Sequence, residues 1–158
     1  MSDKKVNVGI IGLGFGKEFI PIYQKHPNGG KVAICTRRQD VLDEIGNQFG
    51  IDNDFRYTDY HEMVADNRLD AIHVVTPVMD HYPMVMEALN NGRHTACTIP
   101  MATTIQQCKE IVEATQKSGK VYMMMETALY TREYLYVKKM VDEGKIRSEE
   151  HTSELQSH

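Results

Sequence analysis

The sequence predicts an α/β fold, a doubly wound parallel sheet of Rossmann type with helices on both faces. Two observations predict it. Short apolar segments alternate along the chain with longer segments of helical periodicity, which is the pattern of strand–helix–strand units. A glycine-rich turn, GLGFG, also follows the first apolar segment and opens the first helical one. At 158 residues, the chain has the length of about one domain with its own core.

The strands are expected where short apolar runs are bounded by turn residues. The first run is Val6–Ile11, and the loop HPNGG separates the first helix from the second strand. The runs are apolar along most of their length, as expected for a parallel sheet covered on both faces. We expect strands over 6–11, 31–36, 55–57, 71–75, 94–98 and 121–125. Met123–Met125 are expected in the core of a central strand, and His73 is expected to be a buried core residue.

Capping and breaking residues predict the ends of the helices. Asp80 is expected to cap one helix with Pro83 in its first turn, and Thr104 with Gln107 fits a capping box. Pro21 lies inside the first helical segment, where it is expected to kink the helix. We expect helices over 15–26, 41–49, 60–65, 80–91, 104–118 and 131–143.

Composition excludes several classes of function. The formal net charge of −4 gives no electrostatic case for a nucleic-acid or anionic-membrane partner. No apolar run approaches the roughly 18 residues that span a bilayer. The three cysteines form no CxxC motif and are interpreted as reduced thiols, mostly buried, of a cytoplasmic protein. His26 and His61 lie beside no second ligand at a useful spacing, so no metal site is predicted.

The glycine-rich turn predicts a dinucleotide site. Gly12 permits the tight turn after the first strand, and Gly14 lets the backbone approach a pyrophosphate, which the helix N-terminus attracts. Phe15 and Gly16 belong to the same loop and are included in the predicted site. The third glycine of the usual G-x-G-x-x-G would stand at position 17, but Lys17 is there and Gly16 comes one place early.

The end of the second strand indicates which dinucleotide is bound. An acidic residue at this point holds the ribose hydroxyls of NAD, but the chain has Thr36, Arg37 and Arg38. A hydroxyl and two guanidinium groups suit a 2′-phosphate, which favours NADP over NAD. The other interpretation is a solvated arginine pair at a strand end. Asp40 is expected to cap the following helix.

In the glycine-rich turn and the segments quoted below, the chain resembles the N-terminal domain of the Gfo/Idh/MocA family of oxidoreductases. Further markers are YTDYHEMV, LDAIHVVTPVMDH, NNGRHTACTIPMA and EGKI, so the resemblance covers about residues 1–146. It implies that the strand ending at Thr76 and Pro77 passes beneath the nicotinamide, with His81 nearby. It also implies that Thr98 and Pro100 lie at the cofactor.

One segment departs from the family's pattern. The family usually has Glu-Lys-Pro where this chain has Thr98, Ile99 and Pro100, so isoleucine replaces a lysine that helps to position or deprotonate the substrate hydroxyl. Oxidising an alcohol requires a proton acceptor, and a well-placed one contributes about 10²–10⁴-fold to the rate. The candidates within the chain are His81, Glu126 and Tyr130. A residue beyond Ile146 is the other possibility.

For the intact protein, the resemblance implies an NAD(P)-dependent oxidoreductase that acts on a sugar, cyclitol or similar polyol by hydride transfer. A variant is chemistry in which the nicotinamide is oxidised and re-reduced within one cycle, as the glycosidase activity of some relatives implies. The alternative is a catalytically silent homologue that binds a dinucleotide for structure, sensing or partner interaction.

The resemblance also implies a division of the chain. Residues 1–126 are expected to form the dinucleotide-binding domain, and residues 127–146 a linking helix at the start of a missing α+β domain. In relatives that second domain supplies much of the subunit interface, so a homo-oligomer is expected only with it. Residues 147–158, RSEEHTSELQSH, have no apolar period and match the translation of a common sequencing adapter, so we expect a non-native tail.

Overall fold

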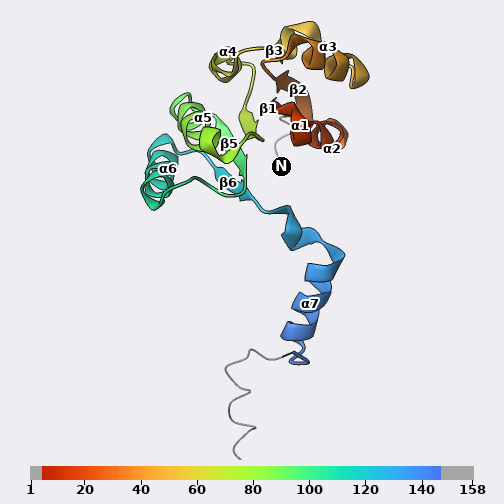
Figure 1. The fold of residues 1–158 in the computed structure, drawn as a ribbon, viewed down its shortest axis with the longest axis vertical. Coiled ribbons are helices and arrows are strands. Elements are labelled where there is room, and N and C mark those ends of the chain that lie inside the picture. The colour runs from red at the N-terminus through yellow and green to blue at the C-terminus, as the bar shows by residue number, and fades with distance from the viewer. Residues whose placement is uncertain (1–4, 147–158) are drawn as a thin grey trace, which may run out of the picture. The chain divides into compact units, whose positions relative to one another are not determined.

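The computed structural model describes residues 5–146, and its centre is a six-stranded parallel sheet. The strand order is β3-β2-β1-β4-β5-β6 (Figure 1), so the direction of winding reverses between β1 and β4. The strands are β1 Val6–Ile11, β2 Gly29–Cys35, β3 Arg56–Tyr57, β4 Ala71–Val74, β5 His94–Thr98 and β6 Tyr122–Met125. This arrangement confirms the predicted doubly wound sheet of Rossmann type.

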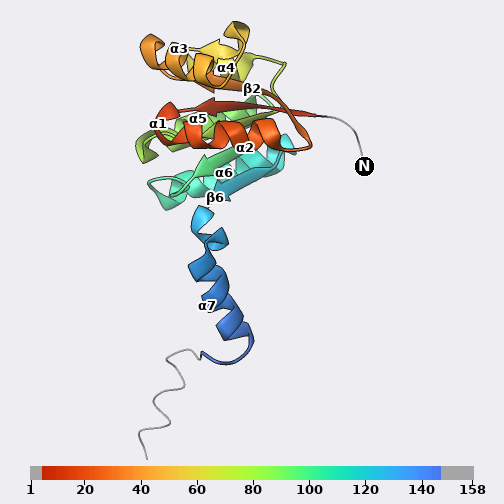
Figure 2. The ribbon, with the colours of Figure 1, turned by 90° about the vertical axis from the view of Figure 1, so that its right-hand side faces the viewer.

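Helices cover both faces of this sheet. In Figure 1, α5 and α6 lie on one side of the strands, and α1 and α2 lie on the other. Figure 2 is turned so that α1 and α2 lie toward the viewer. The helical elements of this part of the chain are α1 Leu13–Gly16, η1 Lys17–Phe19, α2 Ile20–Lys25, α3 Gln39–Gln48, η2 Asn53–Phe55, α4 Tyr60–Ala65, α5 Val78–Asn90 and α6 Ile105–Ser118.

The two faces of β1 show why its last four residues, Val8–Ile11, are apolar or small. On one face, a Cβ at Gly9 would come within 3.0 Å of the side chains of Met63, Leu69 and Ile72, so only glycine lets them pack there. On the other face, Ile10 is fully buried and lies beside Gly16 of α1. Since both faces are covered along Val8–Ile11, neither face carries a polar side chain there.

Of the described residues, 5–125 belong to one compact unit and 126–146 to a second. The described part of the second unit contains η3 Thr127–Tyr130 and α7 Arg132–Asp142. Thr131 caps α7, because its hydroxyl accepts a hydrogen bond from the backbone N–H of Tyr134. The predicted non-native tail, 147–158, lies outside the described residues, and the predicted domain boundary after residue 126 stays a prediction.

The prediction that Met123–Met125 belong to a central strand is wrong. They lie in β6, which pairs only with β5 and forms an edge of the sheet. Met123 and Met124 are 46% and 48% exposed. An apolar run therefore identified the strand correctly but gave no information about its position in the sheet.

Two predicted caps are also wrong. Helix α5 begins at Val78 with Pro77 at the N-cap position, which places Asp80 in the first turn and Pro83 inside the helix. Helix α3 likewise begins after Arg38, so Asp40 lies in its first turn rather than capping it. In both helices the carboxylate still lies where the helix dipole favours negative charge.

The kink predicted at Pro21 and the capping box predicted at Thr104 have different outcomes. The helical segment near Pro21 tightens to 3₁₀ geometry over Lys17–Phe19, and Pro21 then lies at the start of α2, where a missing N–H costs no hydrogen bond. The capping box before α6 is confirmed in part. Thr104 accepts from the N–H of Gln107, but the Gln107 side chain accepts from Thr103 instead of Thr104.

Three further features concern membrane spans, metal sites and the state of the cysteines. Among residues 5–146, no helix combines the length and the apolar character that crossing a bilayer requires. The same residues contain no group of three or more histidine, cysteine, aspartate or glutamate side chains placed to hold a metal ion. The three cysteines are free thiols, of which Cys35 and Cys97 are buried and Cys108 is half-buried.

Candidate functional site

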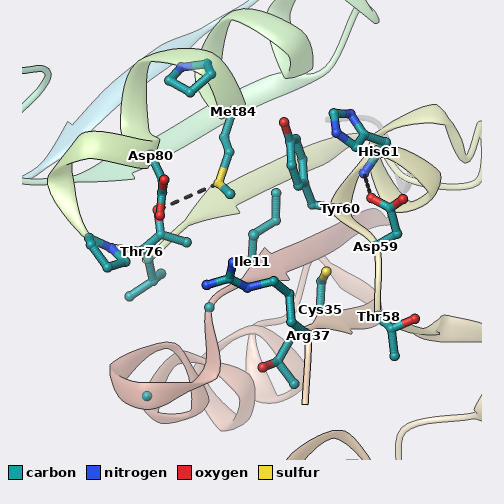
Figure 3. A pocket seen from close by; sticks show the side chains of 16 residues that line it. Ile11, Cys35, Arg37, Thr58, Asp59, Tyr60, His61, Thr76, Asp80 and Met84 are labelled. Carbon is teal, nitrogen blue, oxygen red and sulfur yellow. Dashed lines mark hydrogen bonds between the residues drawn. The ribbon is translucent and has the colours of Figure 1, made fainter. Parts of the chain in front are cut away.

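A cavity of about 710 Å³ opens where β1, β2 and β4 end (Figure 3). The order of the strands reverses at this edge, and the carboxyl ends of strands at such a reversal are the usual binding crevice of open α/β sheets. Sixteen residues line the cavity: Ile11, Gly12, Gly14, Cys35, Thr36, Arg37, Thr58, Asp59, Tyr60, His61, Val75, Thr76, Pro77, Asp80, Pro83 and Met84.

The structure brings together half of the predicted cofactor residues. Gly12, Gly14, Thr36, Arg37, Thr76 and Pro77 all line this cavity. The other predicted residues do not line it: Phe15, Gly16, Arg38, His81, Thr98 and Pro100. The first set comes from the loops after β1, β2 and β4. In the second set, Phe15 and Gly16 lie in α1 and Arg38 directly precedes α3. His81 lies in α5, and Thr98 and Pro100 lie at the end of β5 and after it.

The glycines of the first loop have three different physical roles. Gly12 has φ +93°, and a Cβ there would lie 2.2 Å from the carbonyl oxygen of Val75, so the turn requires glycine. A Cβ at Gly16 would lie 2.9 Å from Ile10, so Gly16 allows close helix–strand packing, the role usually filled one position later. A Cβ at Gly14 would meet no protein atom within 4 Å, so nothing in the fold itself requires glycine there.

The open space in front of Gly14 is what a phosphate ligand needs. Gly14 lines the cavity at the start of the helical segment, where backbone N–H groups are unpaired and the helix dipole is positive. A ligand phosphate can approach this backbone only when no side chain stands in front of it. The loop therefore fits the diphosphate of a dinucleotide.

The two arginines after β2 lie in different surroundings. Arg37 lines the cavity, and its side chain is directed into it in Figure 3. Arg38 points elsewhere, since its Nη2 lies 2.6 Å from Oδ2 of Asp40. This guanidinium lowers the pKa of the Asp40 carboxyl through a hydrogen bond. Arg37 is thus the arginine placed to meet a ligand in the cavity, together with Thr36.

Thr58–His61, which follow β3, form a wall of the cavity that the sequence did not predict. Asp59 caps α4 by accepting from the N–H of His61, which fixes the start of this helix at the cavity. The rings of Tyr60 and His61 lie 4.0 Å apart, and His61 Nδ1 lies 2.7 Å from Oε1 of Glu87. The hydrogen bond to Glu87 raises the pKa of His61.

A signal for this wall was present in the sequence. In a parallel sheet, every strand ends at the same edge, so the residues after β3 must reach the edge that holds the glycine loop. Across the cavity, α5 contributes Asp80, Pro83 and Met84. The Thr76 hydroxyl donates to the sulfur of Met84 at 3.7 Å. Apolar walls, a guanidinium and an open backbone loop together suit a nucleotide, with its base on the walls and its phosphates at the loop.

His81, the candidate proton carrier, is sealed inside the fold. It is 1% exposed. Its Nδ1 lies 2.8 Å from the carbonyl oxygen of Pro100, and its Nε2 lies 2.8 Å from the carbonyl oxygen of Thr76. Both ring nitrogens therefore have partners, and neither is available to a substrate hydroxyl. This geometry opposes a catalytic role for His81.

The end of β5 and the Ile99–Pro100 segment after it carry no group that exchanges a proton near neutral pH. The Thr98 hydroxyl lies 3.5 Å from the carbonyl oxygen of Val74, and Ile99 is 48% exposed. The peptide bond between Ile99 and Pro100 is cis. In the second unit, Glu126 caps η3 by accepting from the N–H of Ala128, and Tyr130 is exposed.

Comparison with known proteins agrees with the fold. The family model described as "Oxidoreductase family, NAD-binding Rossmann fold" (GFO_IDH_MocA) matches residues 6–126. A glycosyl hydrolase family 109 protein of Shewanella baltica (strain OS195) is 34% identical, over 88% of this chain and 32% of the relative. The inositol 2-dehydrogenase/D-chiro-inositol 3-dehydrogenase of Lactiplantibacillus plantarum is 32% identical, over 88% of this chain and 40% of the relative.

Solved structures give the same result. The crystal structure of scyllo-inositol dehydrogenase from Lactobacillus casei with bound NAD(H) and scyllo-inositol has a TM-score of 0.80 at 25% identity, over 90% of this chain and 42% of that chain. The chain thus spans about a third to under half of the length of the relatives it matches. With its family match over 6–126, it belongs to the Gfo/Idh/MocA oxidoreductase family and carries that family's NAD-binding Rossmann domain.

Proposed function

We propose that the chain is the dinucleotide-binding part of an NAD(P)-dependent oxidoreductase that transfers hydride between the nicotinamide and a carbon of a sugar, cyclitol or similar polyol. The observation that carries the proposal is the cavity at the reversal of the strand order, with Gly12 and Gly14 at one end and Arg37 within it. The names of the inositol dehydrogenase relatives support the substrate class. When bound, the nicotinamide supplies the hydride acceptor or donor.

For the cofactor, the proposal favours NADP. Thr36 and Arg37 stand in the cavity after β2, where an acidic residue would hold the ribose of NAD. A guanidinium binds a phosphate through charge-assisted hydrogen bonds, which the unphosphorylated ribose of NAD cannot match. Arg38 would join Arg37 only by giving up its ion pair with Asp40. NAD remains the alternative cofactor.

The proton step is assigned to no residue of the first unit. Ile99 stands in the usual place of lysine, and both nitrogens of His81 are paired with backbone carbonyls. We propose that the acid–base group lies in the part of the intact protein that this chain does not include. A cytoplasmic location and a homo-oligomer formed through a second domain are also part of the proposed function.

The second candidate is a homologue that binds the dinucleotide without turnover. The pairing of His81 together with Ile99 favours it, because the loops at the nicotinamide end then offer no proton carrier. The names of the glycosyl hydrolase relatives support the variant in which the nicotinamide is oxidised and re-reduced within one cycle. These candidates share one binding step and differ only in the chemistry that follows.

The binding step is tested by fluorescence titration of the 158-residue chain with NADPH and NADH in parallel, at low salt. We expect tighter binding of NADPH and loss of this preference in the double variant Arg37→Ala, Arg38→Ala. Equal binding of the two would reject the NADP assignment. Failure to bind either, in a chain with a native circular dichroism spectrum, would reject the function.

A further inference from the structure

The ring of His81 connects two loops that leave neighbouring strands. Thr76, whose carbonyl oxygen accepts at one end, follows β4. Pro100, whose carbonyl oxygen accepts at the other, follows β5. Strands β4 and β5 pair directly in the sheet, and the two oxygens each lie 2.8 Å from a ring nitrogen. The imidazole is therefore a short cross-link between the carboxyl ends of adjacent strands.

We infer that His81 is a positioning residue: its ring bridges the carbonyl oxygens of Thr76 and Pro100 and holds the Thr76–Pro77 and Ile99–Pro100 segments in place at the nicotinamide end of the cofactor site. This inference rests on the proposed function. Both ring nitrogens lie at hydrogen-bond distance from a backbone carbonyl oxygen, so removal of the ring separates both oxygens from their partner. Because the side chain is 1% exposed, solvent does not readily replace these contacts.

The location of His81 limits which part of the ligand it affects. It does not line the cavity that contains Gly14 and Arg37. One of its two partners, Thr76, does line that cavity, and the other, Pro100, does not. The bridge thus extends from the edge of the nucleotide cavity to the segment after β5. We therefore expect its loss to weaken contacts to the nicotinamide while leaving the adenosine contacts intact.

The test compares two ligands on one variant. His81→Phe keeps a ring of similar size and removes both ring nitrogens, and His81→Gln keeps a polar amide group in their place. NADPH contains both ends of the cofactor, whereas 2′,5′-ADP contains only the phosphorylated adenosine end. We expect His81→Phe to bind NADPH about tenfold more weakly, the equivalent of one or two lost hydrogen bonds, and 2′,5′-ADP as tightly as the unmodified chain does. His81→Gln should recover part of the loss.

A matched control is Arg37→Ala, which should weaken both ligands to a similar extent, because the proposed function places this guanidinium at the 2′-phosphate that both ligands carry. Equal weakening of both ligands by His81→Phe would show a general packing role and overturn the inference. Unchanged binding of both would overturn it as well. If the unmodified chain binds neither ligand, the proposed function fails and this inference fails with it.

A spectroscopic measurement covers the case in which His81→Phe does not fold. Nuclear Overhauser contacts of the His81 ring in the unmodified chain report whether the imidazole lies against both loops. Contacts to Thr76 and to Pro100 are expected. Absence of either contact would overturn the bridge, whatever the variants show.

Discussion

Arg38 forms an ion pair with Asp40, with 2.6 Å between Nη2 and Oδ2. The preceding residue, Arg37, lines the cavity instead. Two adjacent arginines that the sequence presents as an equivalent pair are thus divided, one toward the cavity and one toward the first turn of α3. The division has a measurable consequence for binding.

The single variants of these arginines are expected to differ. Arg37→Ala should weaken NADPH binding by about ten- to a hundredfold, the range of a hydrogen bond to a charged group. Arg38→Ala should change it by less than about threefold, because an exposed ion pair is lost and little else. Fluorescence titration of both variants with NADPH and NADH checks this, and equal losses would show that Arg38 leaves Asp40 to bind the ligand.

The three glycines of the loop predict three different outcomes. Gly12→Ala should prevent native folding, since its Cβ would lie 2.2 Å from the carbonyl oxygen of Val75 at φ +93°. Gly14→Ala should fold normally and lose dinucleotide binding, because its Cβ meets only open space in the cavity. Gly16→Ala should fold with lower stability, by about 1–3 kcal/mol for overpacking against Ile10.

Urea unfolding and NADPH titration of each variant separate these outcomes. Normal binding by Gly14→Ala would remove the argument that this loop receives a phosphate. Normal folding by Gly12→Ala would show that the turn relaxes more than its backbone geometry implies.

His61 is expected to titrate above an ordinary histidine. The hydrogen bond to Glu87 raises its pKa, so the folded chain favours the protonated ring. The ion pair is therefore complete below about pH 6.5, the unfolded value, and is lost as pH rises through the higher folded-state pKa. Proton NMR titration should give a raised midpoint that returns toward 6.5 in Glu87→Gln. The exposed Glu44→Gln serves as control and should leave the midpoint unchanged.

His73 is expected to give the opposite pH dependence, in this case of the free energy of unfolding. Burial lowers its pKa to about 4, and its Nε2 has no partner among the described residues, while Nδ1 meets the hydroxyl of Tyr23. The unfolded chain binds the proton more readily, so this contribution is complete above about pH 6.5 and decreases as pH falls toward 4, by roughly 3 kcal/mol in all.

Urea unfolding between pH 4 and 7 measures this dependence. His73→Phe should remove much of the slope, whereas the exposed His26→Gln should retain it. A slope that is unchanged in His73→Phe would assign the acid sensitivity to other groups.

The sequence predicted the sheet well because its signals are local. The glycines after β1, the apolar strands and the loops between them each need only a few neighbouring residues to be identified. What it missed depends on distant partners. Edge and central strands share an apolar composition, so Met123 and Met124 could not be assigned to an edge. The partner of His81 at Pro100 is 19 residues away in the chain, and no pattern of spacing shows that both ring nitrogens are occupied.

The cavity is lined only by residues between Ile11 and Met84. The departure from the family's pattern lies later, at Thr98 and Ile99. The residues that line the nucleotide cavity and the segment associated with proton chemistry are therefore encoded in separate stretches of the gene. Mutation can alter one while selection preserves the other, so a lineage can retain its cofactor while it exchanges, relocates or abandons the reaction.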